Sequence, residues 1–262
     1  MIIVKYMPTT HSNTIPTIPE ASSGSHDFFV QALGRSGLFA NTQPSTFNRF
    51  AEQCQQRRYA KGTVLFLQED EADWCYLIIN GWVKLYRETL DGDEAVVDAL
   101  TSGLMFGETA IFENGKYPYA AEVVEDATLL LLPIRLLAEQ VKQDNQLAFN
   151  MLKIMSRFQR QQDKEIEHRT LQNAPQRIGC FLLRLCRAGA EGEIRLHLPY
   201  DKTLIASRLG MQPETFSRAL GRLKNETGIK VQGSTVIVPS IESLSGYSCS
   251  ACTSSYPCQD SY

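Results

Sequence analysis

The sequence predicts an α+β protein in which an N-terminal β-roll of the jelly-roll type precedes a long helix and a C-terminal winged helix-turn-helix. Three patterns support this fold class. Short apolar runs separated by glycine turns fill the first half, helical spacing runs through the middle, and two short helices followed by a hairpin lie near the end. The expected divisions are a leader, the roll, the long helix, the winged domain and a tail, at residues 1–27, 28–135, 136–172, 173–245 and 246–262.

The composition favours a soluble globular protein with two cores. Of 262 residues, 43% are hydrophobic and 21% are charged, and the net charge is −3. No apolar run is long enough to span a bilayer, and the first residues lack the apolar region of a signal peptide. We therefore expect a cytoplasmic protein, in which the seven cysteines are thiols, metal ligands or redox switches. Paired catalytic carboxylates, a Ser/His/Asp order and a P-loop are all missing, so we expect no enzyme.

The N-terminal half alternates between polar and apolar segments. Residues 1–27 are rich in Thr, Ser and Pro without periodicity, which predicts a disordered leader. A short helical pattern follows, and then come the strand candidates, at residues 61–67, 74–79, 82–86 and 95–100. Three dipeptides that end in glycine are interpreted as turns, namely Asn80-Gly81, Asp91-Gly92 and Ser102-Gly103. Many short strands with such turns predict a jelly roll.

A long helix is expected over residues 136–172. Its apolar stripe steps by four, three and four residues, and polar residues continue it; the members are Leu147, Met151, Ile154, Phe158, Gln161, Glu165 and His168. The apolar half predicts a dimer seam. The alternative is a helix packed on its own roll, and both can hold because a helix has two faces. Asn173-Ala174-Pro175 then breaks the helix and marks a hinge.

The segment from Asp201 to Lys224 predicts two helices around a tight turn. Leu204, Ile205 and Leu209 recur at helical spacing, Gly210 can leave the first helix with positive φ, and Pro213 suits the first turn of the second. A buried stripe in the second helix contains Phe216, Ala219, Leu220 and Leu223, whereas the opposite side carries Glu214, Ser217, Arg218 and Arg222.

The polar side of the second helix has groups that can read bases. A carboxylate accepts from cytosine, and a guanidinium donates to guanine, in a groove that admits a helix. The alternative is an ordinary solvated helical hairpin. A second hairpin at residues 229–238, with a turn at 232–234, follows directly and predicts a wing. Because the overall charge is acidic, DNA binding requires a local basic patch. From Arg208 to Lys224, four basic residues (Arg208, Arg218, Arg222 and Lys224) against Glu214 give +3.

Over residues 28–245 the sequence resembles the Crp/Fnr family of bacterial transcription regulators. The resemblance implies an effector-sensing roll like the cyclic-nucleotide-binding fold, a dimerisation helix, and the partners double-stranded DNA, a second copy and RNA polymerase. Recurring positions of the family's roll are matched by Gly62, Gly81, Gly103, Gly107 and Glu108. Among these, Gly107 and Glu108 are the expected effector-pocket residues.

Two segments resemble the Fnr branch and the related dissimilatory nitrate respiration regulators. After Gly107-Glu108, the cyclic-nucleotide branch carries an Arg-Ser pair that holds the cyclic phosphate, but residues 113–121 contain no arginine. They instead contain the pattern Tyr-Pro-Tyr-Ala. Lys116 offers only a point charge, so a cyclic-nucleotide-responsive regulator is an alternative reading.

The second segment is the recognition helix. Glu214, two intervening residues and Ser217-Arg218 match the Fnr branch, which implies an operator of TTGAT and ATCAA separated by four base pairs. Glu214 and Arg218 would act at its G·C pair, and Ser217 would meet a thymine or a phosphate. Thr215 and Lys224 would position the DNA backbone without reading sequence.

The tail contains Cys249, Cys252 and Cys258, spaced like the cluster-binding cysteines of enteric Fnr, although those lie at the N-terminus. The resemblance implies a 4Fe-4S cluster that responds to oxygen, nitric oxide or redox state. Zinc binding, thiol switching or no role are the alternatives. A fourth ligand is open, with candidates Cys54, Cys75, Cys180, Cys186 and Asp163, although Cys75, Cys180 and Cys186 lie on apolar faces that favour a core position.

Haem is the alternative cofactor, because the nitrate-respiration branch implies it. Its candidate ligands are His11, His26, His168 and His197.

Overall fold

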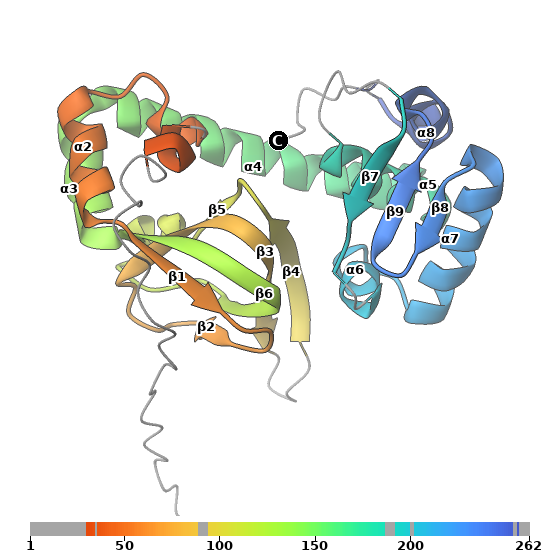
Figure 1. Ribbon diagram of the computed structural model, residues 1–262, viewed down its shortest axis with the longest axis horizontal. Coiled ribbons are helices and arrows are strands. Elements are labelled where there is room, and N and C mark those ends of the chain that lie inside the picture. The colour runs from red at the N-terminus through yellow and green to blue at the C-terminus, as the bar shows by residue number, and fades with distance from the viewer. Residues whose placement is uncertain are drawn as a thin grey trace, which may run out of the picture.

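The computed structural model describes residues 30–34, 36–88, 94–186, 192–199, 202–253 and 256. One long helix, α4 (Asn145–Leu171), runs from a β-roll at one end to a winged helix-turn-helix domain at the other (Figure 1). The predicted α+β class, with its parts in this order, is confirmed. The predicted leader at 1–27 lies outside the described residues, which begin at Val30.

The β-roll consists of antiparallel strands flanked by short helices. Its strands are β1 (Gln55–Tyr59), β2 (Val64–Phe66), β3 (Trp74–Glu88), β4 (Glu94–Thr101), β5 (Met105–Phe106) and β6 (Ala120–Pro133). The sheet order is β1-β6-β3-β4, with β2 paired to β6 and β5 paired to β3. The flanking helices are η1 (Gly37–Phe39), α2 (Pro44–Gln53), η2 (Glu108–Phe112) and α3 (Ile134–Gln143). Phe50, Phe106 and the run Leu129–Leu132 are almost completely buried in this core.

The expected turn at Asn80-Gly81 is wrong, because β3 continues through it. Gly81 has φ +95°, and a Cβ there would lie 2.5 Å from the backbone oxygen of Asp126 in β6. The register between β3 and β6 shifts at this point, so the glycine permits a close approach of two backbones rather than a reversal. Ser102-Gly103 does form the expected turn, with a backbone bond from Leu104 to Thr101. Asp91-Gly92 lies outside the described residues.

The single helix expected over 136–172 is two helices. α3 ends at Gln143, and the side chain of Asp144 starts α4 by accepting hydrogen bonds from the backbone nitrogens of Gln146 and Leu147. The same carboxylate accepts from the backbone nitrogen of Gln43 at 2.9 Å. Asp144 therefore ends one helix, caps the next and holds the start of α2 beside them.

The two faces of α4 have different surroundings. Leu147 and Met151, from the predicted seam, are buried in the core of the roll and are not available to a partner. Farther along, Gln161 is also buried. The large apolar side chains that α4 leaves exposed are Phe149, Leu152, Met155, Phe158, Ile166 and Leu171. Only Phe158 of the predicted seam residues belongs to this exposed set.

The C-terminal domain has the expected winged form. Its elements are α5 (Ala174–Leu185), β7 (Ile194–His197), α6 (Lys202–Arg208), α7 (Pro213–Thr227), β8 (Lys230–Gln232), β9 (Thr235–Val238), α8 (Ile241–Ser248) and η3 (Cys249–Ala251). The small sheet has the order β7-β9-β8. Asn173 and Gln176 form a reciprocal capping box at the start of α5, which fixes the predicted hinge.

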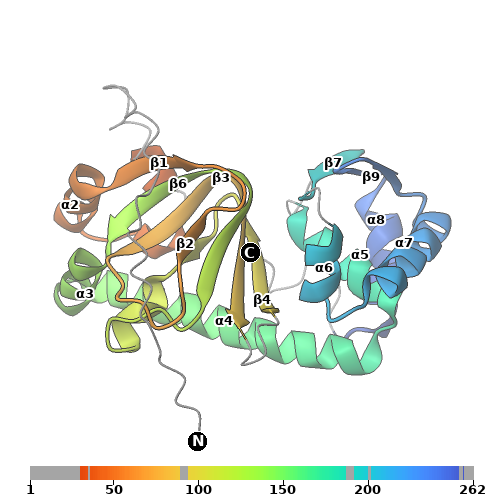
Figure 2. The same cartoon turned by 90° about the horizontal axis from the view of Figure 1, so that it is seen from below.

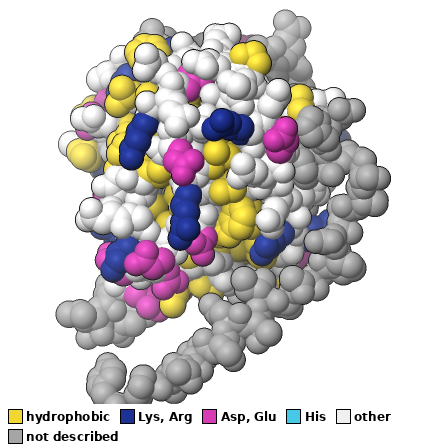
Figure 3. Space-filling model, turned by 90° about the vertical axis from the view of Figure 1, so that its left-hand side faces the viewer, with side chains coloured by type: hydrophobic (Ala, Val, Ile, Leu, Met, Phe, Trp, Pro, Cys, Tyr) yellow, Lys and Arg dark blue, Asp and Glu magenta, His cyan; other side chains and the backbone are white. Residues whose placement is uncertain are grey.

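The winged domain lies against the roll. Trp82 of β3 and Ala99 of β4 are buried in the same apolar cluster as Phe181 and Leu182 of α5. Figure 2 shows α4 running beneath both domains, with β4 facing α6. Figure 3 shows the end of the molecule that carries the roll, farthest from the winged domain, where basic and acidic side chains are mixed with hydrophobic ones on the surface. Among the described residues no helix is long and apolar enough to cross a membrane.

Candidate nucleic-acid interface

The helix-turn-helix is formed by α6 and α7. Gly210 has φ +62° in the turn between them, and Pro213 begins α7 at a position where no backbone donor is lost. Phe216, Ala219 and Leu223 bury one face of α7 in the winged-domain core. Gly228, with φ +74°, ends the helix in the left-handed conformation. The local sequence signals therefore fix both ends of α7 and the face that it turns inward.

The outer face of α7 contains the predicted base-reading residues. Glu214, Ser217 and Arg218 are exposed, and Thr215 is half-buried. Glu214 lies in the first turn, and Arg218 follows four residues later on the same face. Arg222 and Lys224 are exposed farther along the helix. A carboxylate and a guanidinium thus lie side by side at the N-terminal end of a helix whose opposite face is packed.

Arg208, counted in the predicted basic patch, is not part of this surface. It is only 5% exposed and lies at the end of α6. Its Nε donates to Oδ1 of Asp98 in β4 at 2.7 Å, and its Nη1 donates to Oε2 of Glu165 in α4 at 2.8 Å. Nη2 completes a bidentate contact with Oε1 of Glu165. Between Arg208 and Lys224, the exposed basic residues are therefore Arg218, Arg222 and Lys224.

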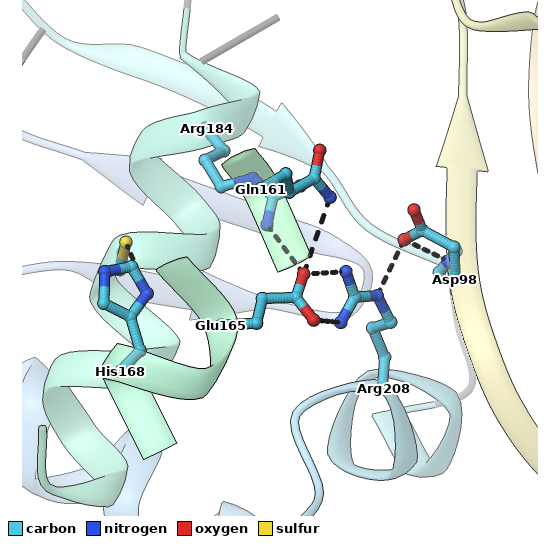
Figure 4. Close-up of polar contacts among 8 residues, drawn as sticks. Asp98, Gln161, Glu165, His168, Arg184 and Arg208 are labelled. Carbon is cyan, nitrogen blue, oxygen red and sulfur yellow. Dashed lines mark hydrogen bonds and ion pairs between the residues drawn. The ribbon is translucent and has the colours of Figure 1, made fainter. Parts of the chain in front are cut away.

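The contacts of Arg208 connect three parts of the fold, as Figure 4 shows. Asp98 belongs to the roll, Glu165 to the long helix and Arg208 to the helix-turn-helix. Glu165 also accepts from Nη1 of Arg184 at 3.4 Å and from Nε2 of Gln161 at 3.5 Å. Asp98 is 5% exposed, so its charge depends on Arg208 for compensation.

The pKa values of Glu165 and Arg208 are both shifted in the direction that favours their charged forms. Burial by itself would raise the pKa of Glu165, but the hydrogen bonds and charge of Arg208 lower it below its ordinary value. Burial would likewise lower the pKa of Arg208, and Asp98 and Glu165 raise it instead. Glu165 and Arg208 are therefore both charged at neutral pH.

A signal for the inward position of Arg208 is present in the sequence. It follows Leu204 by four residues and Ile205 by three, so helical spacing places it on the buried face of α6. Counting charges along the chain missed this. The partners Asp98 and Glu165 had no local signal, because they are more than 40 residues away and meet Arg208 only in the folded chain.

The expected effector-pocket residues lie inside the roll. Gly107 is in the left-handed conformation, and a Cβ there would lie 3.2 Å from the ring of Tyr117. The carboxylate of Glu108 has one oxygen, Oε2, buried without a hydrogen-bond partner, and burial raises its pKa. Beside them, the rings of Phe66 and Tyr117 stack with their centroids 3.5 Å apart.

Aromatic side chains therefore fill this part of the roll. The ring of Tyr76 stacks on that of Phe106 at 4.9 Å, and the hydroxyl of Tyr119 accepts from the backbone nitrogen of Gly107 at 3.4 Å. The segment 113–121 supplies tyrosines here, in agreement with its lack of arginine. Segment 113–121 itself therefore offers a phosphate no guanidinium, although that of Arg87 in β3 contacts the segment, where its Nε donates to the backbone oxygen of Pro118 at 3.2 Å.

The predicted cluster ligands are described only in part. Cys249 and Cys252 lie half-buried in and just after η3, where the backbone nitrogen of Cys252 donates to the oxygen of Cys249. Cys258 lies outside the described residues. Within the described residues no group of three or more His, Cys, Asp or Glu side chains is arranged to hold a metal ion.

Cys252 contacts the imidazole of His168, and that ring also contacts Cys180. The Sγ of Cys252 lies 3.6 Å from Nε2 of His168, and the Sγ of Cys180 lies 3.8 Å from Nδ1 of the same ring. Because the two thiols contact opposite ring nitrogens, one ion cannot bind all three groups in this arrangement. Burial lowers the pKa of His168, which favours the neutral imidazole.

The other cysteines are core residues. Cys75, Cys180 and Cys186 are buried, which confirms the prediction made for them, and Cys54 is buried as well. Burial raises the pKa of Cys54 and of Cys186 to about 11, so these thiols stay protonated at neutral pH. Asp163, the remaining candidate for a fourth ligand, lies exposed on α4.

The histidines proposed for haem have other contacts where the structure describes them. Nε2 of His197 in β7 lies 2.6 Å from Oε1 of Glu125 in β6, which is a second polar link between the winged domain and the roll. His168 contacts the two thiols described above. His11 and His26 lie outside the described residues.

Comparison with known proteins agrees with this architecture. Residues 56–144 match the cyclic nucleotide-binding domain family, and residues 176–247 match the Crp-like helix-turn-helix domain family. The cyclic AMP receptor protein of Thermus thermophilus is 30% identical over 205 residues, which cover 78% of this chain and 92% of that protein. The nitrogen fixation regulation protein FixK of Rhizobium meliloti is 33% identical over 183 residues, covering 68% of this chain and 80% of FixK.

A crystal structure shows the same fold. The structure of a candidate cyclic nucleotide-binding protein from Ruegeria pomeroyi superposes with a TM-score of 0.68 at 34% identity, covering 86% of this chain and 99% of that one. The matches span the roll, the long helix and the winged domain, and the relatives named above are regulators. The chain therefore belongs to the Crp/Fnr family of DNA-binding transcription regulators.

Proposed function

We propose that this regulator binds, as a homodimer, an inverted repeat of TTGAT and ATCAA separated by four base pairs, and that it responds to oxygen, nitric oxide or redox state. The observation that carries the DNA half of the proposal is the outer face of α7. Glu214, Ser217 and Arg218 are exposed there, on a helix whose other face is fixed by buried Phe216 and Leu223.

Each residue on this face has a separate role. The guanidinium of Arg218 donates to guanine in the central G·C pair, and the carboxylate of Glu214 accepts from the paired cytosine. Ser217 contacts a thymine or a phosphate. Thr215, Arg222 and Lys224 contact the DNA backbone, which sets the position of the helix without reading bases.

The homodimer places two copies of α7 on the two half-sites. Its seam is the exposed apolar face of α4, where Leu152 is 62% and Phe149 53% exposed. Exposure of such an apolar stripe to water is unfavourable in a monomer, whereas a second copy can cover the stripe by a two-fold contact. RNA polymerase is the further partner that a regulator on such a site would meet.

Fluorescence anisotropy with labelled duplexes tests the DNA half. We expect Arg218→Ala and Glu214→Ala each to weaken binding to the palindrome by about 1 to 3 kcal/mol while leaving binding to a scrambled duplex almost unchanged. Lys224→Gln should weaken binding to both duplexes and reduce the salt dependence by about one ion. Arg135→Gln, on the exposed side of α3, is the control. Equal discrimination by the parent and both alanine variants would refute the proposal.

For the signal, the interior of the roll argues against a cyclic nucleotide. Phe66, Tyr76 and Tyr117 fill it with stacked or tilted rings, and segment 113–121 supplies no guanidinium. The sensor is then sought at the tail, where Cys249, Cys252 and Cys258 would hold a 4Fe-4S cluster. A bound cluster would supply reactivity towards oxygen and nitric oxide. The contact of Cys252 with His168 would connect the tail to α4.

Purification without oxygen, followed by absorption spectroscopy and iron and sulfide analysis, tests the sensor. We expect the purified protein to contain iron and sulfide and to show a visible absorption that bleaches on exposure to air. The iron, the sulfide and the absorption should all be absent from Cys249→Ser and Cys252→Ser. Haem in the purified protein would instead support the haem-based nitric-oxide sensor. A colourless protein with unchanged DNA binding in air would refute a cluster.

A cyclic nucleotide is the second candidate signal, favoured by the family match over residues 56–144 and by the cyclic AMP receptor protein among the relatives. Equilibrium dialysis with cyclic AMP separates the two. Saturable binding that increases affinity for the palindrome would replace the redox proposal, and we expect none.

A further inference from the structure

A polar pocket lies between the long helix and the winged domain, and no residue of α7 lines it. It is a cavity of about 30 Å³ with walls from α4, α5 and α6. Four arginines line it, namely Arg169, Arg177, Arg184 and Arg208, together with one carboxylate, Glu165. A cavity of this size holds roughly two or three waters or one small ion.

The charges in this pocket do not balance. Glu165 pairs with both Arg208 and Arg184, and Asp98 of the roll also pairs with Arg208, so these two carboxylates are already used by two of the four arginines. Arg169 and Arg177 have no acidic partner among the described residues. A partly enclosed pocket with excess positive charge is unfavourable unless an anion occupies it.

Arg177 supplies a second, independent sign of a missing ligand. Its Nε is buried and has no hydrogen-bond acceptor. Burial lowers the pKa of Arg177, and the positive charge of Arg169 lowers it further. Buried donors in folded proteins are almost always paired, and a guanidinium is a preferred partner for oxyanions.

We propose that this pocket binds a small tetrahedral oxyanion of the phosphate class, held chiefly by Arg177 and Arg169. The guanidinium of Arg169 lies 3.8 Å from the position that a Cβ would take at Gly210, the turn of the helix-turn-helix. Arg208, at the end of α6, forms another part of the wall. A bound oxyanion therefore bridges α4, α5 and the DNA-binding unit and stabilises their present arrangement. The lining of the pocket includes no residue of the roll, the tail or α7, although His168 in its wall contacts Cys252 of the tail and Arg208 contacts Asp98 of the roll.

Calorimetric titration of the full chain with inorganic phosphate, exchanged against chloride at constant ionic strength, tests the proposal. We expect saturable binding at one site per chain and a rise in melting temperature. Arg177→Gln and the exposed Arg169→Gln should each weaken phosphate binding at least roughly tenfold. Arg177→Lys, which keeps the charge but loses the fork, should weaken it less. Arg135→Gln, an exposed arginine on α3, should bind phosphate like the parent.

Several outcomes would overturn the site. Phosphate binding that is unchanged in Arg169→Gln and Arg177→Gln would place the anion elsewhere, and a non-saturating response would mean simple screening. AMP carries the same phosphate on a nucleoside too large for the cavity, so AMP competing as well as free phosphate would also contradict the proposal. Circular dichroism of each variant confirms folding. Phosphate binding and palindrome binding are measured separately, so one can fail without the other.

Discussion

Gly81 is the residue at which backbone geometry is most restrictive. It combines φ +95° with only 2.5 Å between a built Cβ and the backbone oxygen of Asp126. Gly81→Ala should therefore lower the free energy of unfolding by about 2 kcal/mol or more, measured by urea denaturation. Gly221→Ala is the matched control, because Gly221 lies in the middle of α7, exposed and with open space around it. This variant should raise the free energy of unfolding by about 0.5 to 1 kcal/mol. Equal effects at the two sites would contradict this account of β3.

Arg208 is the residue whose removal should cost the most through charge. Arg208→Met leaves the buried carboxylate of Asp98 without compensation and leaves Glu165 with Arg184 alone, and we expect a loss of about 3 to 5 kcal/mol in the free energy of unfolding. Adding Asp98→Asn should recover part of that loss, because the uncompensated charge is then removed. Arg195→Met is the control, since its pair with Glu193 is exposed and should contribute less than about 1 kcal/mol. A double variant no more stable than Arg208→Met would argue against the charge mechanism.

At the scale of elements, periodicity predicted the helices and the wing, but it did not predict which other elements each of them packs against or pairs with. The glycine at 210 and the proline at 213 located the helix-turn-helix, because φ preferences act locally. The sequence QQRRY of β1 has no alternating apolar pattern, so that strand was missed; its pairing with β6 depends on the partner strand. The fate of Asn80-Gly81 was likewise decided by β6, which lies more than 40 residues away.

The two faces of α4 illustrate the same limit. The predicted seam residues Leu147 and Met151 have helical spacing, but spacing does not say which domain covers them. In the structure they pack on the roll, and Leu152 lies on the open face. For the candidate site, sequence placed Glu214 and Arg218 on an outer face but could not pair Arg208 with Asp98, because only the folded chain brings them together.

The exposed face of α4 leads to a prediction about assembly. Leu152→Glu should weaken self-association at least roughly 100-fold, because two copies of the charge would be buried at a two-fold seam. Sedimentation equilibrium measures the change. Leu67→Glu is the control, since Leu67 is 50% exposed on the roll and α4 does not include it. A dimer of unchanged stability in Leu152→Glu would exclude this face as the seam.

On the scale of the whole molecule, the two domains are joined by apolar packing and by charge. Trp82 and Ala99 supply the packing, and the Asp98–Arg208–Glu165 contacts and the His197–Glu125 contact supply the polar links. Any change of signal in the roll or the tail that alters DNA binding must act through these contacts or through α4. The position of the recognition helix is therefore set partly by residues far from the DNA-binding face.

The link through Glu165 gives this molecule a defined pH dependence. Its pKa is lower in the folded chain than its ordinary value, so the carboxylate stabilises the fold above about pH 4.3 and loses this contribution as the pH falls towards its folded pKa. Glu165→Gln should therefore be less stable than the parent at neutral pH, and the difference in free energy of unfolding should shrink in acid. Urea denaturation across that range measures it, with Glu139→Gln, an exposed carboxylate on α3, as the control for lost charge. A difference that stays constant down to the acid limit would mean that Glu165 stabilises the domain contact by packing, and that its charge has no part in holding the winged domain against the roll.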